Sequence, residues 1–191
     1  MKNNFKVFFN DYLQQLVSSI KLSDYNQIEK ASSRILETIK KKGTVFICGN
    51  GGSAAIANHY VCDYLKYLRQ HTSLKPKVIS LSSNLETITA ISNDLKYDQI
   101  FKYQAENLIK KNDILIVISS SGNSKNIKEV VKYCKKKNIK VIGFSGFNGG
   151  FLKKTSDISI HIPALNYGIS EDSHHIIMHV ILQFLISKNK R

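Results

Sequence analysis

Long apolar segments are missing from this chain of 191 residues. No run approaches the roughly 20 residues that a membrane-spanning helix needs. Residues 1–16 are interrupted by Asn, Asp and Gln, unlike a secretory signal peptide. We therefore expect a protein that is neither inserted in a membrane nor exported. The hydrophobic content of 42% is ordinary for a globular protein and argues against disorder.

Cysteine is also scarce, with Cys48, Cys62 and Cys134 as the whole set. Their number is odd and their spacing fits no metal site, so we expect reduced thiols in a cytoplasmic protein. Linkers rich in Pro or Gly, repeats and low-complexity tracts are absent as well. The length and this uniformity predict a single domain over residues 1–191.

Acidic residues are few, with 14 Asp and Glu against 28 Lys and Arg, which gives a formal net charge of +14. A basic chain binds nucleic acid or attracts small anionic substrates. The lysine runs fall mainly where helices are expected to end, and cations there complement the helix dipole. No basic run is interleaved with aromatic residues. Solvated helix ends are therefore favoured over a nucleic-acid interface.

The hydrophobic pattern changes its period after about residue 42. Residues 5–20 and 28–39 follow helical spacing, and the pattern then alternates between β-rich runs and helical stretches. The five β-rich runs are residues 44–48, 77–81, 113–118, 139–144 and 157–162. The helical stretches are residues 53–66, 85–110, 123–137, 150–154 and 170–187. This alternation predicts an α/β fold, a doubly wound five-stranded parallel sheet in residues 43–191.

The first 42 residues are expected to form a helical hairpin in front of this core. Its apolar faces, rich in Phe5, Phe8, Phe9 and Tyr12, exceed what one small sheet needs to cover itself. We therefore predict that they form an oligomer interface in a tetramer.

Two polar loops follow predicted strands and precede predicted helices. The first, residues 48–53, reads Cys-Gly-Asn-Gly-Gly-Ser, and the second, residues 119–124, reads Ser-Ser-Ser-Gly-Asn-Ser. Each is either a capped tight turn or a phosphate site, because free amides at a helix start attract anions. Two such loops at the ligand-binding edge of one sheet favour the phosphate site. Neither is a Walker loop, and Ala54 replaces the third glycine of a dinucleotide fingerprint.

A third feature combines imidazoles and carboxylates. His59 and Asp63 are four residues apart on one face of a predicted helix, which suits two ligands of one metal or an acid–base pair. The last helix offers five candidates: Glu171, Asp172, His174, His175 and His179. Of these, Glu171 and His179 are about 12 Å apart along the helix axis. One ion reaches both only with stretched side chains, so His175, one turn before His179, is the competing ligand.

Together these motifs resemble the SIS (sugar isomerase) domain family, whose fold is flavodoxin-like, and within it the phosphoheptose isomerases. The resemblance covers nearly the whole chain and is carried by residues 48–55, 88–94, 119–124 and 171–179. It implies a homotetramer with active sites between subunits. It also implies isomerisation of sedoheptulose 7-phosphate to D-glycero-D-manno-heptose 7-phosphate for surface polysaccharide, through an enediol.

The resemblance also implies roles for particular residues. Phosphate and sugar would be bound by a set drawn from both loops, the 88–94 segment and the last helix: Asn50, Gly51, Gly52, Ser53, Asn93, Asp94, Ser119, Ser120, Ser121, Ser124 and Glu171. A zinc ion would be bound by His59, Asp63, Glu171 and His179. The last three would also carry the proton transfer.

Two positions depart from the family pattern, which has Glu where this chain has Asp63 and Gln where it has Glu171. The two changes either compensate for each other or mark a different function. The alternatives are an isomerase of another sugar phosphate, or a non-catalytic scaffold like the DnaA initiator-associating protein. A sugar-phosphate sensor is a third, but no DNA-reading module accompanies the domain. The cluster of metal-binding residue types favours the enzyme over a scaffold.

Overall fold

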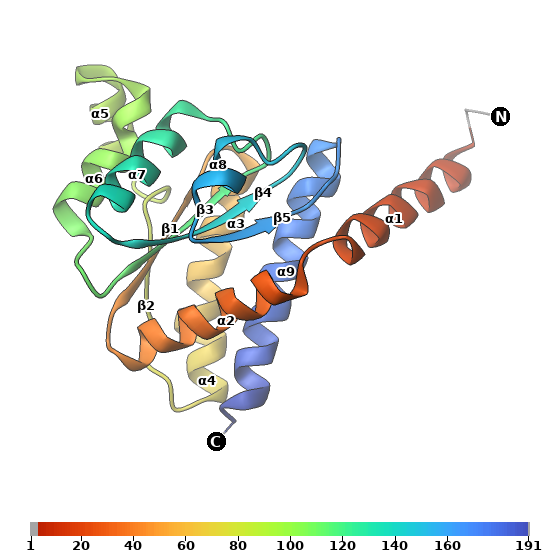
Figure 1. The fold of residues 1–191 in the computed structure, drawn as a ribbon, viewed down its shortest axis with the longest axis horizontal. Helices are drawn as coiled ribbons and strands as arrows, with labels where there is room; N and C mark the ends of the chain where they lie inside the picture. Colours follow the sequence, from red (N-terminus) through yellow and green to blue (C-terminus); the bar gives the residue numbers. More distant parts are fainter. Residues whose placement is uncertain (1–3, 191) are drawn as a thin grey trace.

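The computed structural model describes residues 4–190 and confirms the doubly wound α/β fold. Five parallel strands form one sheet in the order β2-β1-β3-β4-β5 (Figure 1). Each end differs from that of the predicted run by at most one residue: β1 Thr44–Gly49, β2 Lys77–Ser80, β3 Ile114–Ser119, β4 Lys140–Ser145 and β5 Ile158–His161.

The strand order reverses between β1 and β3, where the chain turns from one half of the sheet to the other. Ligands of open parallel sheets bind in the crevice beyond the carboxyl ends of the strands at this switch point. The two polar loops follow β1 and β3, so the fold places both at the crevice.

Helices cover both faces of the sheet, and each face has its own apolar core. Alternate residues of β1 show the division, since Ile47 packs with one core while Phe46 and Cys48 pack with the other. The first face is covered by α2 (Tyr25–Lys40), α3 (Gly52–Cys62) and α9 (Tyr167–Lys188). The second is covered by α5 (Leu85–Asp94), α6 (Ile100–Leu108), α7 (Lys125–Lys136) and α8 (Gly150–Thr155).

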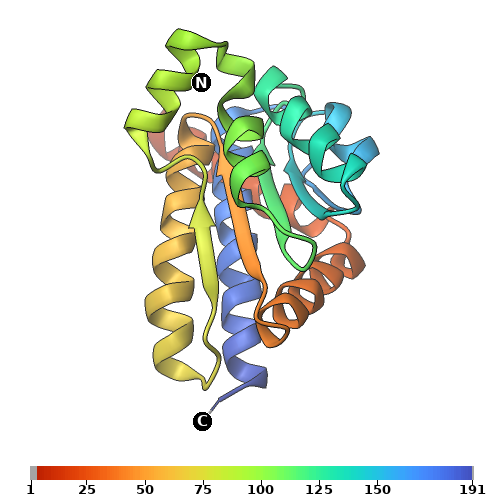
Figure 2. The ribbon, with the colours of Figure 1, turned by 90° about the vertical axis from the view of Figure 1, so that its left-hand side faces the viewer.

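The helix after the first loop is longer than predicted and changes its winding at Asp63. It continues from α3 through a π-helical segment, Asp63–Leu68, and a last short turn, α4 (Arg69–His71). Figures 1 and 2 show that this continuous helical segment lies alongside α9. An isolated β-bridge between Thr72 and Lys190 joins the two segments near their ends. Single π-helical turns often occur at functional sites, and here the turn begins at a predicted site residue.

The helical stretch predicted for residues 85–110 is helical but divided, because the chain breaks between α5 and α6. Lys96 has extended backbone, and a short 3₁₀ turn, Tyr97–Gln99, leads into α6. Asn93 and Asp94 immediately before the break favour caps and turns over helix interiors.

The first two helices do not form the predicted hairpin. Figure 1 shows α1 (Phe5–Lys21) projecting away from the sheet instead of folding back on α2, and both helices pack against α9. Tyr12 anchors α1 by donating a 2.6 Å hydrogen bond to Asp172 of α9, which raises the pKa of Tyr12 to about 12. Within residues 4–190, no helix combines the length and the hydrophobicity of a membrane span.

Candidate active site

The serine loop at the end of β3, residues 119–124, forms one wall of a small cavity at the switch point. The cavity measures about 150 Å³. Its lining comes from both polar loops, the end of β3 and the first turns of α9: Asn50, Ser53, Ile118, Ser119, Ser120, Ser121, Ser124, Tyr167 and Glu171. The structure thus brings together the serine loop, part of the glycine loop and Glu171, all of which the sequence singled out.

Several hydroxyls of the serine loop are available to a ligand. Ser120 is 5% exposed, and its hydroxyl has no hydrogen-bond partner among the described residues. Ser124 is the N-cap of α7, yet its side chain does not cap the helix. These unused hydroxyl donors lie at the start of α7, where the helix dipole is positive. Hydroxyl donors and a helix N-terminus together form an arrangement that binds phosphate.

The glycine loop lies so close to α9 that a side chain at Gly52 would displace the carboxylate of Glu171. A Cβ added to Gly52 would overlap the carboxylate of Glu171. Gly51 has φ of +53°, a left-handed conformation that favours glycine. The Glu171 carboxylate therefore lies against the start of α3, where the helix dipole stabilises a negative charge.

Asn50 of the glycine loop is held by two residues that the sequence analysis missed. Its Nδ2 donates to Asn126 Oδ1 (3.0 Å), and its Oδ1 accepts from Asn126 Nδ2 (2.8 Å) and from the Tyr97 hydroxyl (3.0 Å). Asn126 is 2% exposed and also accepts from the amide of Ile127. The network fixes the orientation of the Asn50 amide at the cavity. A polar Asn on an otherwise apolar helix face was the available signal.

The second part of the site joins α3 and the π-helical segment that continues it to α9 through three side chains. His59 Nε2 lies 3.2 Å from His179 Nε2, and Asp63 Oδ2 lies 3.4 Å from the first and 3.2 Å from the second. The side chains of His59, Asp63 and His179 are 47%, 20% and 46% exposed, so solvent and small ligands reach them.

This triangle matches the donor set of a zinc site. Tetrahedral Zn²⁺ with bonds of about 2.0–2.1 Å holds its ligand atoms roughly 3.3–3.4 Å apart. The three observed separations are within about 0.2 Å of that spacing. Two imidazoles and a carboxylate are also the residue types that Zn²⁺ prefers. The residues present therefore fit the metal that the motifs predicted.

The family model described as the SIS domain matches residues 8–146. The chain belongs to the SIS domain family. Among curated proteins, the phosphoheptose isomerase of Campylobacter concisus is 35% identical over 156 residues, covering 82% of each chain. That of Helicobacter hepaticus is 33% identical over 181 residues, covering 94% of this chain and 90% of its own.

Solved structures agree with this SIS domain assignment. A phosphoheptose isomerase from Francisella tularensis superposes with a TM-score of 0.85 at 29% identity, covering 96% of each chain. The phosphoheptose isomerase GmhA of Neisseria gonorrhoeae gives the same TM-score at 26% identity, covering 95% of this chain and 96% of its own.

The histidines of α9 in this SIS domain separate into two groups. His175 faces the site, with its ring centroid 4.7 Å from that of His59 and 4.5 Å from that of His179. His174 points into the core against Phe144, where burial lowers its pKa to about 4. His174 is therefore a neutral core residue, whereas one ring nitrogen of His175 lies within 4.8 Å of ring nitrogens of His59 and His179.

Two predicted sugar contacts lie away from the cavity of this SIS domain. Asn93 and Asp94 are exposed at the end of α5, where Asn93 Nδ2 donates to Asp94 Oδ1 over 2.9 Å. Neither lines the cavity. Their predicted contact with sugar requires a ligand that extends beyond the cavity or a neighbouring subunit.

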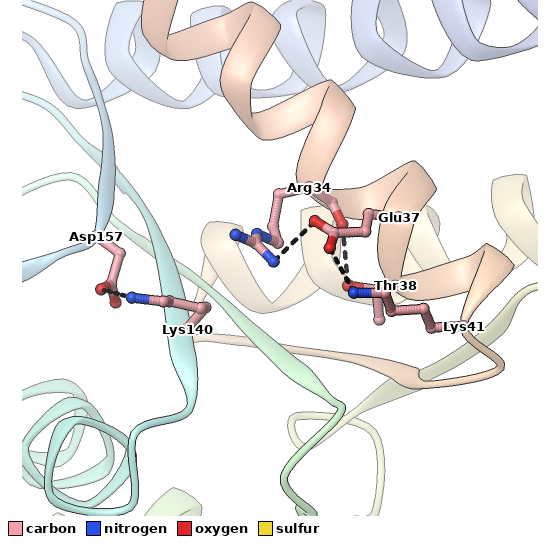
Figure 3. Close-up of polar contacts among 6 residues, drawn as sticks. All are labelled: Arg34, Glu37, Thr38, Lys41, Lys140 and Asp157. Atoms are coloured by element: carbon pink, nitrogen blue, oxygen red, sulfur yellow. Dashed lines mark hydrogen bonds and ion pairs between the residues drawn. The ribbon is translucent and has the colours of Figure 1, made fainter.

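A wider hollow of about 730 Å³ lies at the opposite edge of the sheet, between α2 and the starts of β4 and β5. Figure 3 shows that charged side chains there pair with one another: Glu37 bridges Arg34 (2.8 Å) and Lys41 (2.7 Å), and Lys140 contacts Asp157 (3.0 Å). Ligands of this fold class bind at the other edge, so this hollow is not the candidate active site.

Proposed function

We propose that this protein is a phosphoheptose isomerase, which converts sedoheptulose 7-phosphate to D-glycero-D-manno-heptose 7-phosphate for surface polysaccharide. The curated relatives carry that name over most of their length. One structural observation carries the proposal. A phosphate-type cavity and a metal-type cluster lie along the same pair of helices, α3 and α9, about two helical turns apart.

The separation suits an extended sugar phosphate. From Gly52 to His59 the axial distance along α3 is about 10 Å. A phosphate at the serine loop would place the far end of a seven-carbon chain near His59, Asp63 and His179. The reacting carbons, C1 and C2, lie at that far end of the substrate. This geometry supports binding by the phosphate and chemistry at the cluster.

Phosphate binding is assigned to the serine loop. The hydroxyls of Ser119, Ser120, Ser121 and Ser124 and the first amides of α7 donate to the phosphate oxygens. Hydrogen bonds to a charged group are worth about 1.5–3 kcal/mol each. Asn50, Gly51, Gly52 and Ser53 form the facing wall, where the Asn50 amide has one further N–H to donate to a sugar hydroxyl.

Proton transfer is assigned to Glu171 and His179, with Asp63 holding the metal. Zinc, bound by the cluster, would polarise the carbonyl oxygen and stabilise the enediolate. The isomerisation moves one proton between C1 and C2, which needs a base and an acid within reach of both carbons. Glu171 and His179 both project from α9, Glu171 at the cavity and His179 at the cluster, so we propose that C1 and C2 bind between them, with Glu171 as the base and His179 as the partner acid.

Oligomerisation completes the proposal. On α1, Phe5, Phe9, Leu13 and Val17 recur every fourth residue and are at least 41% exposed. Such a stripe on a projecting helix supports the predicted homotetramer with active sites between subunits. All three cysteines are free, which supports a reducing compartment, the cytoplasm.

The test is incubation of the zinc-loaded protein with sedoheptulose 7-phosphate, followed by NMR of the products. The proposal predicts signals of the aldose phosphate that grow with enzyme concentration. Sedoheptulose 7-phosphate that stays unchanged while a second ketose phosphate is isomerised would redirect the proposal to that sugar. No turnover of any ketose phosphate would favour the scaffold.

A further inference from the structure

We infer that Tyr97 and Asn126 are positioning residues of the active site, which hold the Asn50 amide so that it offers the ligand only an N–H. The inference rests on the sugar-phosphate cavity of the proposed function, and not on the metal cluster or on the identity of the sugar.

The backbone amide of Ile127 fixes the orientation of the Asn126 side chain. An N–H group can only donate, so the Asn126 atom that lies 2.9 Å from the Ile127 nitrogen is the oxygen, Oδ1. The other end of the Asn126 amide is therefore the NH₂ group. Asn126 is buried, so bulk water does not compete for these two ends.

Asn126 in turn fixes the orientation of Asn50. Asn126 Oδ1 accepts from Asn50 Nδ2 over 3.0 Å, and Asn126 Nδ2 donates to Asn50 Oδ1 over 2.8 Å. Turning the Asn50 amide over would place one NH₂ group against the other and one oxygen against the other. Leaving buried donors and acceptors unpaired is costly, so the pair strongly favours one orientation of Asn50.

The Tyr97 hydroxyl completes the arrangement by donating to Asn50 Oδ1 over 3.0 Å. A carbonyl oxygen has two lone pairs, and both lone pairs of Asn50 Oδ1 are now used. One N–H of Asn50 remains for a ligand of the cavity that Asn50 lines. The amide therefore recognises a ligand oxygen that accepts a hydrogen bond, such as one of a sugar phosphate.

The break between α5 and α6 brings Tyr97 to this position. The 3₁₀ turn Tyr97–Gln99 packs against α7, the helix that carries Asn126. Tyr97 and Asn126 line a second hollow of about 480 Å³, which shares Asn50 and Ser124 with the small cavity. The lining of the small cavity itself includes neither Tyr97 nor Asn126. Both residues therefore act through Asn50 on a ligand bound there.

The experiment is a double-mutant cycle on ligand affinity, measured by calorimetry on the zinc-loaded full chain. The ligand is the heptitol 7-phosphate obtained by borohydride reduction of sedoheptulose 7-phosphate, which has no carbonyl group to isomerise. The variants are Tyr97→Phe, Asn50→Ala and the double variant. The matched control is Tyr103→Phe, because Tyr103 is an exposed tyrosine of α6 that lines neither hollow.

One hydrogen bond of ordinary strength corresponds to roughly a 2- to 13-fold change in affinity. We expect Tyr97→Phe to weaken binding by such a factor, and to have no further effect in the Asn50→Ala background, where the group that it holds is gone. Tyr103→Phe should bind like wild type. Unchanged affinity in Tyr97→Phe would overturn the inference. An equal loss in both backgrounds would also overturn it, because Tyr97 would then act without Asn50.

Asn126→Leu provides a second cycle with Asn50→Ala. Leucine has a similar size and no charge, but it removes both hydrogen bonds to Asn50. The loss of affinity should be at least as large as in Tyr97→Phe and should again disappear in the Asn50→Ala background. Tyr97 is exposed, so the first cycle remains decisive if the buried Asn126→Leu change prevents folding.

The inference and the proposed function fail separately. Coupling of Tyr97 to Asn50 in a protein that turns over no ketose phosphate refutes the isomerase alone. An active isomerase in which the effects of Tyr97→Phe and Asn50→Ala simply add refutes only this inference. A wild type that does not bind the heptitol 7-phosphate contradicts both.

Discussion

Replacing Gly52 with alanine should separate activity from stability. The added Cβ would overlap one Glu171 carboxylate oxygen and come within 2.8 Å of the other, where an ordinary contact needs at least 3.4 Å. The carboxylate is the end of a flexible side chain, so it moves by about 1 Å while the backbone stays. A misplacement of that size in a catalytic group costs about 100-fold in rate.

Stability should change in the opposite direction. Gly52 is the first residue of α3 and, unlike Gly51, has no positive φ. Replacing a helical glycine by alanine at a compatible position stabilises a protein by about 0.4–1 kcal/mol. Urea denaturation should therefore show Gly52→Ala at least as stable as wild type, while kcat for sedoheptulose 7-phosphate falls by about 100-fold.

A double-mutant cycle controls for effects that do not pass through Glu171. In a Glu171→Ala background, Gly52→Ala should cost little further activity, because the displaced group is already gone. Wild-type activity in Gly52→Ala would refute the assignment of Glu171 as the base. An equal loss in both backgrounds would show that the alanine acts on the loop itself.

Three further predictions concern the phosphate site, the oligomer and the thiols. Ser124→Ala should weaken sugar-phosphate binding by about 1.5–3 kcal/mol, seen as a raised KM with unchanged thermal stability, and an unchanged KM would remove Ser124 from the phosphate site. Wild type should be tetrameric by light scattering at micromolar concentration, and Phe9→Glu should give smaller species, whereas a monomeric wild type would refute the interface. Burial raises the pKa of Cys134 to about 12 and that of Cys48 well above its usual range. The thiolate is the reactive form of cysteine. A thiol reagent at pH 8 should therefore modify only the exposed Cys62 in the native chain and all three cysteines in denaturant. Three fast-reacting thiols in the native protein would contradict the burial of Cys48 and Cys134.

The sheet and its two loops could be predicted because their signals are local. Continuous apolar runs encode buried parallel strands, and glycine or serine clusters after them encode the loops. The break at Lys96 and the π-helical turn at Asp63 could not be foreseen, since both depend on packing against neighbouring elements. The hairpin was predicted wrongly for the same reason: an amphipathic pattern in α1 shows that a face is apolar but not what covers it.

The candidate site could likewise be predicted only where its signals are local in the sequence. The residue types and the i, i+4 spacing of His59 and Asp63 were readable, because a helix places them on one face. Which of His174 and His175 faces the cluster depends on how α9 is rotated against the sheet, and this required the structure. Asn50 is held by Tyr97, which follows it by 47 positions in the chain, and by Asn126, which follows it by 76. No local sequence pattern could therefore have revealed this network.

The isomerase assignment is tested most directly by the reaction in deuterated water. Zinc-loaded protein and sedoheptulose 7-phosphate are incubated, and the product is examined by ¹H and ¹³C NMR. A proton shift through an enediol, with a base that exchanges its proton with solvent, predicts D-glycero-D-manno-heptose 7-phosphate carrying deuterium at C2. An unchanged ketose in the presence of folded, zinc-loaded protein would contradict the proposed function.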